Sequence, residues 1–219
     1  PRSTLFPYTT LFRSERSNTF RERAQVTIKP SAKDLRLHFT IDGTEPTESS
    51  STYEKPITIK DTTSIKAVAI NSKGEQSLVT TAALHKIPND WSVRILSRYS
   101  SQYTGGGDQA LIDGLRGNGN FHVAWHGYWR QDFAAVVDLG KVQEIRKLGA
   151  GFLQDVQSWI WMPRRVELEI STDAEVFTPV ASIRNEVSDK TYGAIVRDFV
   201  TPIAPQRAAF RSEERRVGK

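Results

Sequence analysis

The sequence predicts an all-β protein made of two tandem antiparallel β-sandwiches. Period-two runs of apolar residues occur in both halves of the chain, and each run places an apolar row on one face of a strand. Turn residues such as Asp-Gly and Asn-Ser-Lys-Gly separate these runs. No amphipathic helix of ten or more residues is recognisable, so strands account for the expected regular structure.

The two ends of the chain are related through the DNA that could encode them. Residues 211–219, RSEERRVGK, can be written in codons whose reverse complement translates in frame to FPYTTLFRS, which is residues 6–14. A DNA linker ligated to both sides of an insert produces such a pair, whereas a folded domain has no physical reason to do so. We therefore expect residues 1–14 and 211–219 to be translated sequencing-adapter sequence, outside the fold.

The charge of the remaining chain is small. The formal net charge is +5, and each end contributes +2, so +1 belongs to residues 15–210. This balance does not favour binding to nucleic acid or to an anionic membrane surface. No run of eighteen apolar residues suggests a membrane span, and the absence of Cys excludes a disulfide framework and Cys-based zinc or thiol chemistry.

Residues 22–87 are expected to form a small, immunoglobulin-like sandwich. Between residues 35 and 42, four apolar residues alternate with four polar ones, with His38 in the polar row and Ile41 in the apolar row. This pattern predicts a half-buried strand. The run 65–70 is apolar on both faces after its first residues, which predicts a central strand. Pro88-Asn89-Asp90 punctuates the chain and predicts the domain boundary.

Residues 90–210 are expected to form the second sandwich. Val166, Leu168 and Ile170 alternate with polar residues, which predicts a strand with one buried face. The series continues with the apolar residues Val136, Val137, Leu139, Ile145, Leu148, Phe152, Ile183, Val196 and Phe199. The segment containing Trp125 to Trp129 is polar and contains glycine, and we expect it to be a loop.

Both segments resemble known modules. The run HFTIDGTEPTESSSTYEKPITIKDTTSIKAVAINSKGEQS, residues 38–77, resembles the chitobiase C-terminal β domain of β-N-acetylhexosaminidases. The blocks YSSQYTGGGDQALIDGLRGNGNF, YWRQDFAAVVDLGKVQEI and GFLQDVQSWIWMPRRVELEISTD resemble a discoidin domain, the coagulation factor five/eight type C fold, which includes carbohydrate-binding module family thirty-two. This order is similar to the C-terminal region of secreted bacterial glycoside hydrolases of family twenty.

The resemblance implies a discoidin-like jelly roll that is truncated. The family's domain closes with a further strand, which also supplies a calcium-ligating Glu, but this chain enters the adapter-like end after Phe210. We therefore expect the jelly roll to lack its last strand and to leave an open edge.

The residues do not favour catalysis. Glycoside hydrolysis needs carboxyl groups on both sides of the scissile bond, and the resembled enzymes carry an adjacent Asp-Glu pair on their catalytic barrel. No Asp-Glu dipeptide occurs in this chain, and none of its four His residues belongs to an HExxH motif. The Gly-rich stretches lack the strand-then-helix context of a phosphate loop. We expect no enzymatic activity of the chain itself.

Aromatic clusters favour sugar recognition instead. A pyranose stacks its C–H face on an aromatic ring and offers hydroxyls to a few fixed donors and acceptors. Four of the five Trp residues lie in two short segments, 125–129 and 159–161. Core packing is the alternative for any single Trp, because discoidin domains bury Trp and the spacing of Trp159 and Trp161 puts both on one face of an extended segment. The candidate carbohydrate-binding residues are Trp125, His126, Tyr128, Trp129, Trp159, Trp161 and Arg164.

The resemblance also implies a structural calcium ion. The segment 110–115, ALIDGL, matches the family's calcium motif. Asp113 would supply its carboxylate, Ala110 and Leu115 their carbonyls, and Asn118 an amide oxygen, which are the hard oxygen ligands that calcium prefers. The alternative is that Asp113-Gly114 is simply a turn.

Three functional hypotheses follow. The first is a glycan-binding accessory region that holds a periplasmic, cell-surface or extracellular β-N-acetylhexosaminidase near terminal N-acetylhexosamine or galactose. The second is a structural region that packs on the parent's catalytic barrel in cis. The third is a protein-binding or lipid-binding discoidin, which the small net charge disfavours.

Overall fold

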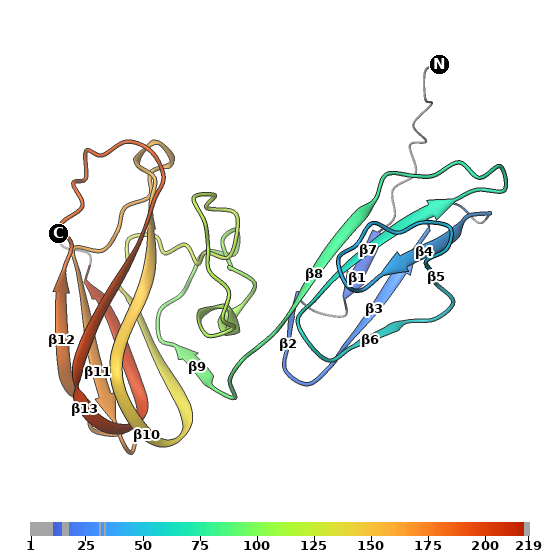
Figure 1. Cartoon of the computed structure of the whole chain (residues 1–219). Coiled ribbons are helices and arrows are strands. Elements are labelled where there is room, and N and C mark those ends of the chain that lie inside the picture. Colours follow the sequence, from blue (N-terminus) through green and yellow to red (C-terminus); the bar gives the residue numbers. More distant parts are fainter. Residues whose placement is uncertain (1–10, 15–17, 31, 33, 217–219) are drawn as a thin grey trace. The chain divides into compact units, whose positions relative to one another are not determined.

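The computed structural model describes residues 11–14, 18–30, 32 and 34–216 (Figure 1). The chain divides between Pro88 and Asn89 into two compact units, and we describe each by itself. Strands dominate both units. The helical elements among the described residues are two short 3₁₀ turns, η1 (Asp108–Leu111) and η2 (Val156–Ser158). The all-β prediction is therefore confirmed, and no helix in the described part of the chain is long and apolar enough to cross a membrane.

Unit 1 contains two sheets, with strand orders β1-β3-β6 and β2-β8-β7-β4-β5. Val26 and Ile59 from the first sheet pack against Ile65 and Leu84 from the second, so the core lies between the sheets. The strands are β1 (Leu11–Ser14), β2 (Thr19–Phe20), β3 (Ala24–Lys29), β4 (Arg36–Thr40), β5 (Ser51–Thr52), β6 (Ile57–Ile59), β7 (Thr63–Ile70) and β8 (Thr80–Lys86).

The predicted central strand of unit 1 is confirmed. β7 pairs with β4 on one side and with β8 on the other, in the middle of its sheet. Its residues Ile65 and 67–70 are buried, because a strand flanked on both sides and covered on both faces excludes water from its apolar side chains.

The alternation predicted for residues 35–42 is wrong at two positions. His38 is buried, and its Nδ1 lies 2.9 Å from the carbonyl oxygen of Ser50. Ile41 is 52% exposed. The reason is local: β4 ends at Thr40, so Ile41 lies beyond the strand, and the segment that leads into β5 approaches the His38 side chain through the carbonyl group of Ser50.

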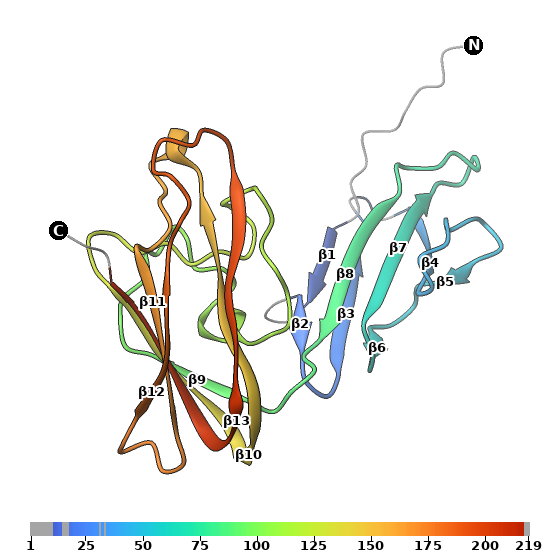
Figure 2. The same ribbon diagram turned by 60° about the vertical axis from the view of Figure 1, so that its left-hand side comes forward.

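Unit 2 is built on a sheet of order β12-β11-β13-β10-β9. β10 and β13 form a long antiparallel ribbon from the pair Phe133–Arg215 to the pair Gln154–Ile195. Register shifts near residues 138–147 mark the bend of this ribbon, which can be followed in yellow and red in Figure 2. The strands are β9 (Ser92–Ile95), β10 (Phe133–Gln154), β11 (Arg165–Ser171), β12 (Thr178–Arg184) and β13 (Ile195–Arg216).

The bend lets the ribbon cover both sides of the core. Leu148 and Phe199, which lie beyond the bend, pack against Val166 and Leu168 of β11 and against Ala208. A sheet that folds back in this way buries both inner faces, which gives the sandwich arrangement expected from the sequence.

Residues of the excluded C-terminal end pair with the sheet of unit 2, while the absence of the family's own closing strand stays a prediction. β13 continues past Phe210 to Arg216 and lies between β10 and β11, with Arg211 opposite Val137 on one side and Ile170 on the other. Likewise, β1 pairs with β3 although it belongs to the excluded N-terminal end. Backbone pairing needs only an extended segment beside an open edge, so it does not depend on a particular sequence. Residues 1–10 and 217–219 lie outside the described residues, and the adapter origin of both ends stays a prediction.

Two loops meet at one end of unit 2. The loop after β10 and the loop that joins β12 to β13 lie at the same end in both views (Figures 1 and 2). The side chain of Gln154 connects them, because its Nε2 donates to the carbonyl oxygen of Ser188 over 2.8 Å. The segment 96–132 between β9 and β10 carries η1 and no strand, and its Gly119 lies beside Ala194.

Candidate functional site

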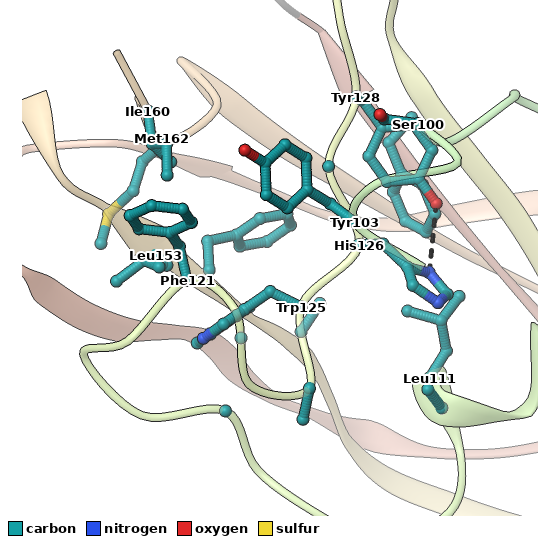
Figure 3. A pocket seen from close by; sticks show the side chains of 18 of the residues that line it. Ser100, Tyr103, Leu111, Phe121, Trp125, His126, Tyr128, Leu153, Ile160 and Met162 are labelled. Carbon is teal, nitrogen blue, oxygen red and sulfur yellow. Dashed lines mark hydrogen bonds between the residues drawn. The ribbon is translucent and has the colours of Figure 1, made fainter. Parts of the chain in front are cut away.

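A pocket of about 890 Å³ lies within unit 2, and we call it the loop pocket (Figure 3). The segment 100–131, strand β10 and the segment 158–162 supply most of its walls. Aromatic rings are prominent among its lining residues: Tyr103, Phe121, Trp125, Tyr128, Trp129, Phe133, Phe152, Trp159 and Trp161.

Strand β10 forms the floor of the loop pocket. Phe133, Ala135 and Val137 line the pocket and are buried. Their spacing is that of one face of a strand, so the period-two rule explains why all three reach the same space.

Trp125 is fixed in the wall of the pocket. Its Nε1 donates to the carbonyl oxygen of Asn118 over 2.9 Å. A Cβ on Gly117 would come within 2.2 Å of the indole, so the ring packs directly on the glycine backbone. The indole is half-buried, and one side of it is therefore unavailable to a ligand.

His126 is held by contacts on several sides. Its Nε2 lies 3.0 Å from the carbonyl oxygen of Gly107, which can only accept, so Nε2 carries the proton. Nδ1 lies 3.4 Å from the hydroxyl of Tyr128, and the ring stacks on Tyr99 with centroids 4.5 Å apart. Burial lowers the pKa of His126 below its ordinary value, while hydrogen bonds and Asp108 act in the opposite direction. The neutral imidazole therefore connects the glycine-rich loop to the pocket wall.

Trp159 and Trp161 form an exposed pair at the mouth of the loop pocket. The two indoles are 76% and 40% exposed, and their ring centroids lie 5.9 Å apart at an interplanar angle of 79°. The segment is not extended as the sequence suggested, because η2 and a left-handed backbone at Trp159 (φ 60°, ψ 35°) turn the chain here. Both residues are nevertheless exposed, so this pair is not packed in the buried core.

Three hydrogen bonds lie within the loop that carries this pair. The backbone groups of Asp155 and Ile160 donate to each other, both over 3.0 Å. The hydroxyl of Ser158 donates to the Asp155 carboxylate over 2.6 Å. Hydrogen bonds of this kind restrain a loop, and a restrained loop loses less entropy when it binds a ligand.

Trp129 is a third exposed indole that lines the loop pocket, with 70% of its surface accessible. The guanidinium of Arg130 lies 5.6 Å from the centroid of this ring, at cation–π distance. Arg164, by contrast, is exposed and does not line the loop pocket. The structure therefore brings together six of the seven sequence-predicted carbohydrate-binding residues and leaves Arg164 outside.

Sequence reasoning missed several lining residues. Arg116 and Asp198 form an ion pair in the wall of the pocket although 82 positions separate them. Tyr103 and Phe121 face the interior of the pocket (Figure 3). No local pattern could identify these residues, because their proximity depends on how the segment 96–132 folds over β10.

The residues of the expected calcium motif lie in a tight turn. Asp113 is buried, and its Oδ1 accepts a hydrogen bond from the backbone N–H of Leu115 over 2.8 Å. The side-chain oxygen of Asn118 accepts from the N–H of Asn120 over 2.8 Å. Among the described residues no group of three or more His, Cys, Asp and Glu could hold a metal. Any cation here would depend on one carboxylate and on neutral oxygens, which is a donor set that calcium accepts.

Comparisons with known proteins agree with the resemblance of unit 1. The family model of the chitobiase/β-hexosaminidase C-terminal domain matches residues 15–81, which confirms the expectation for residues 38–77. A comparison with curated proteins finds no match. The matched family covers unit 1, whereas the loop pocket lies in unit 2.

Solved structures similar to this chain include carbohydrate-binding modules and chitobiase C-terminal domains. One is a family 32 carbohydrate-binding module from Clostridium perfringens in complex with GalNAc-β-1,3-galactose, with 16% identity, a TM-score of 0.40 and coverage of 58% of this chain and 85% of that one. Another is the C-terminal domain of a chitobiase from Bacteroides fragilis, with 15% identity, a TM-score of 0.44 and coverage of 60% and 85%. A third is a putative chitobiase fragment from Bacteroides thetaiotaomicron, with 17% identity, a TM-score of 0.39 and coverage of 57% and 75%.

Proposed function

We propose that unit 2 binds carbohydrate at the mouth of the loop pocket. The observation that carries this proposal is the exposed pair Trp159–Trp161 on a loop whose hydrogen bonds fix it in place. Two perpendicular indoles offer a face and an edge, against which the C–H groups of a pyranose can pack. Trp129 supplies a third ring at the same pocket.

The expected contribution of these rings suits a weak sugar site. An indole presents roughly 200 Å² of surface, so covering half of it contributes about 2.5 kcal/mol at about 25 cal/mol per Å². A millimolar Kd corresponds to about 4 kcal/mol. Two ring contacts are therefore enough to account for binding of this strength.

The remaining predicted residues take supporting roles in this proposal. Trp125, His126 and Tyr128 form the wall that positions the loops, since their polar atoms already have partners within the protein. The ligand of the proposal is a glycan that ends in N-acetylhexosamine or galactose. Arg164 would contact only a ligand that extends beyond the loop pocket.

We further propose that the chain is a non-catalytic accessory region of a secreted β-N-acetylhexosaminidase. The match of unit 1 to the C-terminal domain of chitobiase and β-hexosaminidase supports this parent. A module that tethers an enzyme to its substrate raises the local concentration, so even millimolar affinity is useful. Unit 1 would then contact the parent's catalytic barrel in cis.

Glycan binding by the full chain tests the proposal. We expect binding on a glycan array to N-acetylhexosamine-terminated or galactose-terminated glycans, with about tenfold weaker affinity in Trp159→Ala or Trp161→Ala. Tyr192→Ala is the matched control, because Tyr192 is 75% exposed but does not line the loop pocket. Unchanged affinity in both tryptophan variants would contradict the proposed site, and binding to anionic liposomes alone would favour a lipid-binding module.

A structural calcium ion at Asp113 is the second part of the proposal. Asp113, the carbonyls of Ala110 and Leu115, and Asn118 would hold the ion, which would neutralise a buried carboxylate. We expect calcium to raise the Tm of the chain and chelation to reverse the shift. Asp113→Asn should abolish the shift, because Asn keeps an oxygen acceptor for the Leu115 N–H but loses the charge.

The control for the calcium prediction is Asp189→Asn, which removes an exposed carboxylate from unit 2. The calcium-dependent shift in Tm should persist in this variant. The calcium proposal fails if the Asp113→Asn variant and the unsubstituted chain show the same calcium-dependent shift in Tm.

A further inference from the structure

The loop pocket is large, and part of its lining is apolar. Its lining includes the buried residues Phe133, Leu153 and Met162. The rings of Tyr103 and Phe121 face the same space (Figure 3). Protein interiors hold few voids larger than a water molecule, whereas a volume of about 890 Å³ is typical of pockets that enclose a ligand.

Small residues keep this space open. Ala135 and Ala150 on β10 line the pocket, where larger apolar side chains would fill it. Glycine is required at the neighbouring position 149 for another reason, because a Cβ there would lie 2.5 Å from the carbonyl oxygen of Phe199. The two alanines therefore mark positions at which the volume of the interior can be changed.

Several polar groups around the pocket already have partners within the protein, and the guanidinium of Arg211, which also lines the pocket, lies 5.4 Å from the centroid of the Trp91 ring. Trp125 donates to a backbone carbonyl, His126 has contacts at both ring nitrogens, and Arg116 pairs with Asp198. A sugar hydroxyl that entered the interior would lose its hydrogen bonds to water, which costs free energy unless new partners replace them. A hydrocarbon group has no such cost and gains from leaving water.

We propose that the interior of the loop pocket binds an aliphatic chain attached to the sugar that stacks on Trp159 and Trp161, so that the ligand is a glycolipid-like glycoconjugate. This inference rests on the proposed carbohydrate-binding function and adds the chemical class of the ligand. The sugar remains at the exposed indoles, and the aliphatic chain of the ligand extends past Trp161 toward Met162 and Ala135.

The test measures Kd for the full chain with a series of methyl, butyl, hexyl and octyl β-glycosides of N-acetylglucosamine and of galactose, below their micelle concentrations. We expect affinity to increase about fourfold per added methylene until the pocket is full, which is the equivalent of about 0.8 kcal/mol for each buried methylene. Equal Kd values for the methyl and octyl glycosides would overturn the inference and leave the proposed sugar site intact. Failure of every glycoside to bind would overturn both.

A variant that fills the pocket tests whether the aliphatic chain of the ligand binds there. Ala135→Leu should collapse the ratio of methyl to octyl Kd toward one, and Ala150→Leu serves the same purpose if the first variant does not fold. The matched control is Ala134→Leu, one position along β10 and outside the pocket lining, which should keep the ratio. An unchanged ratio in both pocket variants would overturn the inference, as would an affinity for 1-octanol equal to that for the octyl glycosides.

Discussion

Trp159 combines two features that do not stabilise the fold. Its backbone adopts the left-handed conformation, which costs a bulky residue about 1–2 kcal/mol, and its indole is 76% exposed. The hydrogen bonds between Asp155 and Ile160 hold the loop in place despite this strain. Strained and exposed residues of this kind are concentrated at functional sites, which is why Trp159 carries the proposed sugar contact.

His126 shows the opposite situation. The sequence presents it beside Trp125 as one more candidate ligand contact, but its ring is stacked on Tyr99 and its nitrogens face Gly107 and Tyr128. These contacts depend on the tertiary structure, and residue type alone does not predict them.

The lowered pKa of His126 predicts a pH dependence of stability. Because the folded state prefers the neutral ring, the unfolded chain binds the proton first, at about pH 6.5. Stability is therefore complete above this value and decreases as the pH falls below it, until the folded pKa is reached. We expect the Tm of unit 2 to fall between pH 7.5 and pH 5.5 by more than in His126→Gln, measured by thermal denaturation at each pH.

Two exposed carboxylates do not interfere with this comparison. Hydrogen bonds lower the pKa values of Asp42 and Asp173, so their contributions are lost only in more acidic solution. If the unsubstituted chain and the His126→Gln variant show the same dependence of Tm on pH, His126 has the same pKa in the folded and unfolded states.

Among the elements, β13 decides whether unit 2 is closed. It runs along β10 for its whole length and also pairs with β11. Without its last residues, β10 and β11 would each present a row of unpaired N–H and C=O groups, which are templates for aggregation. Closure therefore depends on residues 211–216, which were expected to lie outside the fold.

Deletion of residues 211–219 is expected to lower the Tm of unit 2 and to promote aggregation, because β10 and β11 lose a shared partner. Thermal denaturation and light scattering measure the two effects. Replacement of residues 212–216 by threonine should retain most of the Tm, since backbone pairing needs only an extended chain. Equal Tm values for the deleted and complete chains would show that this pairing does not stabilise the unit.

At the scale of the whole molecule, the family match and the loop pocket lie in different units. The family match lies in unit 1, and every lining residue of the loop pocket lies in unit 2. Each unit also has its own hydrophobic clusters. The family-model match and the candidate site therefore lie in different parts of the chain.

Destabilising unit 1 should leave glycan affinity unchanged. Ile65 is fully buried in the core of unit 1, so Ile65→Ala is expected to cost about 2–5 kcal/mol of unfolding free energy there. Calorimetry should show a lower Tm for one transition, while the Kd for the glycan stays the same. A Kd that changes in parallel with this Tm would contradict the assignment of the site to unit 2.

Some features were predictable because they depend on neighbouring residues. The apolar run at 65–70 identified β7 as a central strand, and the alternation of Val166, Leu168 and Ile170 identified the buried face of β11. The exposure of Ile41 was not predictable, because it depends on where β4 ends. Nor was the pairing of Arg116 with Asp198, which requires two distant segments to meet.

By itself, the sequence determined that the chain is all-β, that strands alternate with turns, and that tryptophans are concentrated in two short segments. Local spacing and composition are enough for these conclusions, since strand periodicity is a property of adjacent residues. Tertiary structure alone decided which tryptophans are exposed, that His126 is engaged, and that β13 closes the sheet. These outcomes depend on burial and on long-range pairing, which arise only when distant segments pack together.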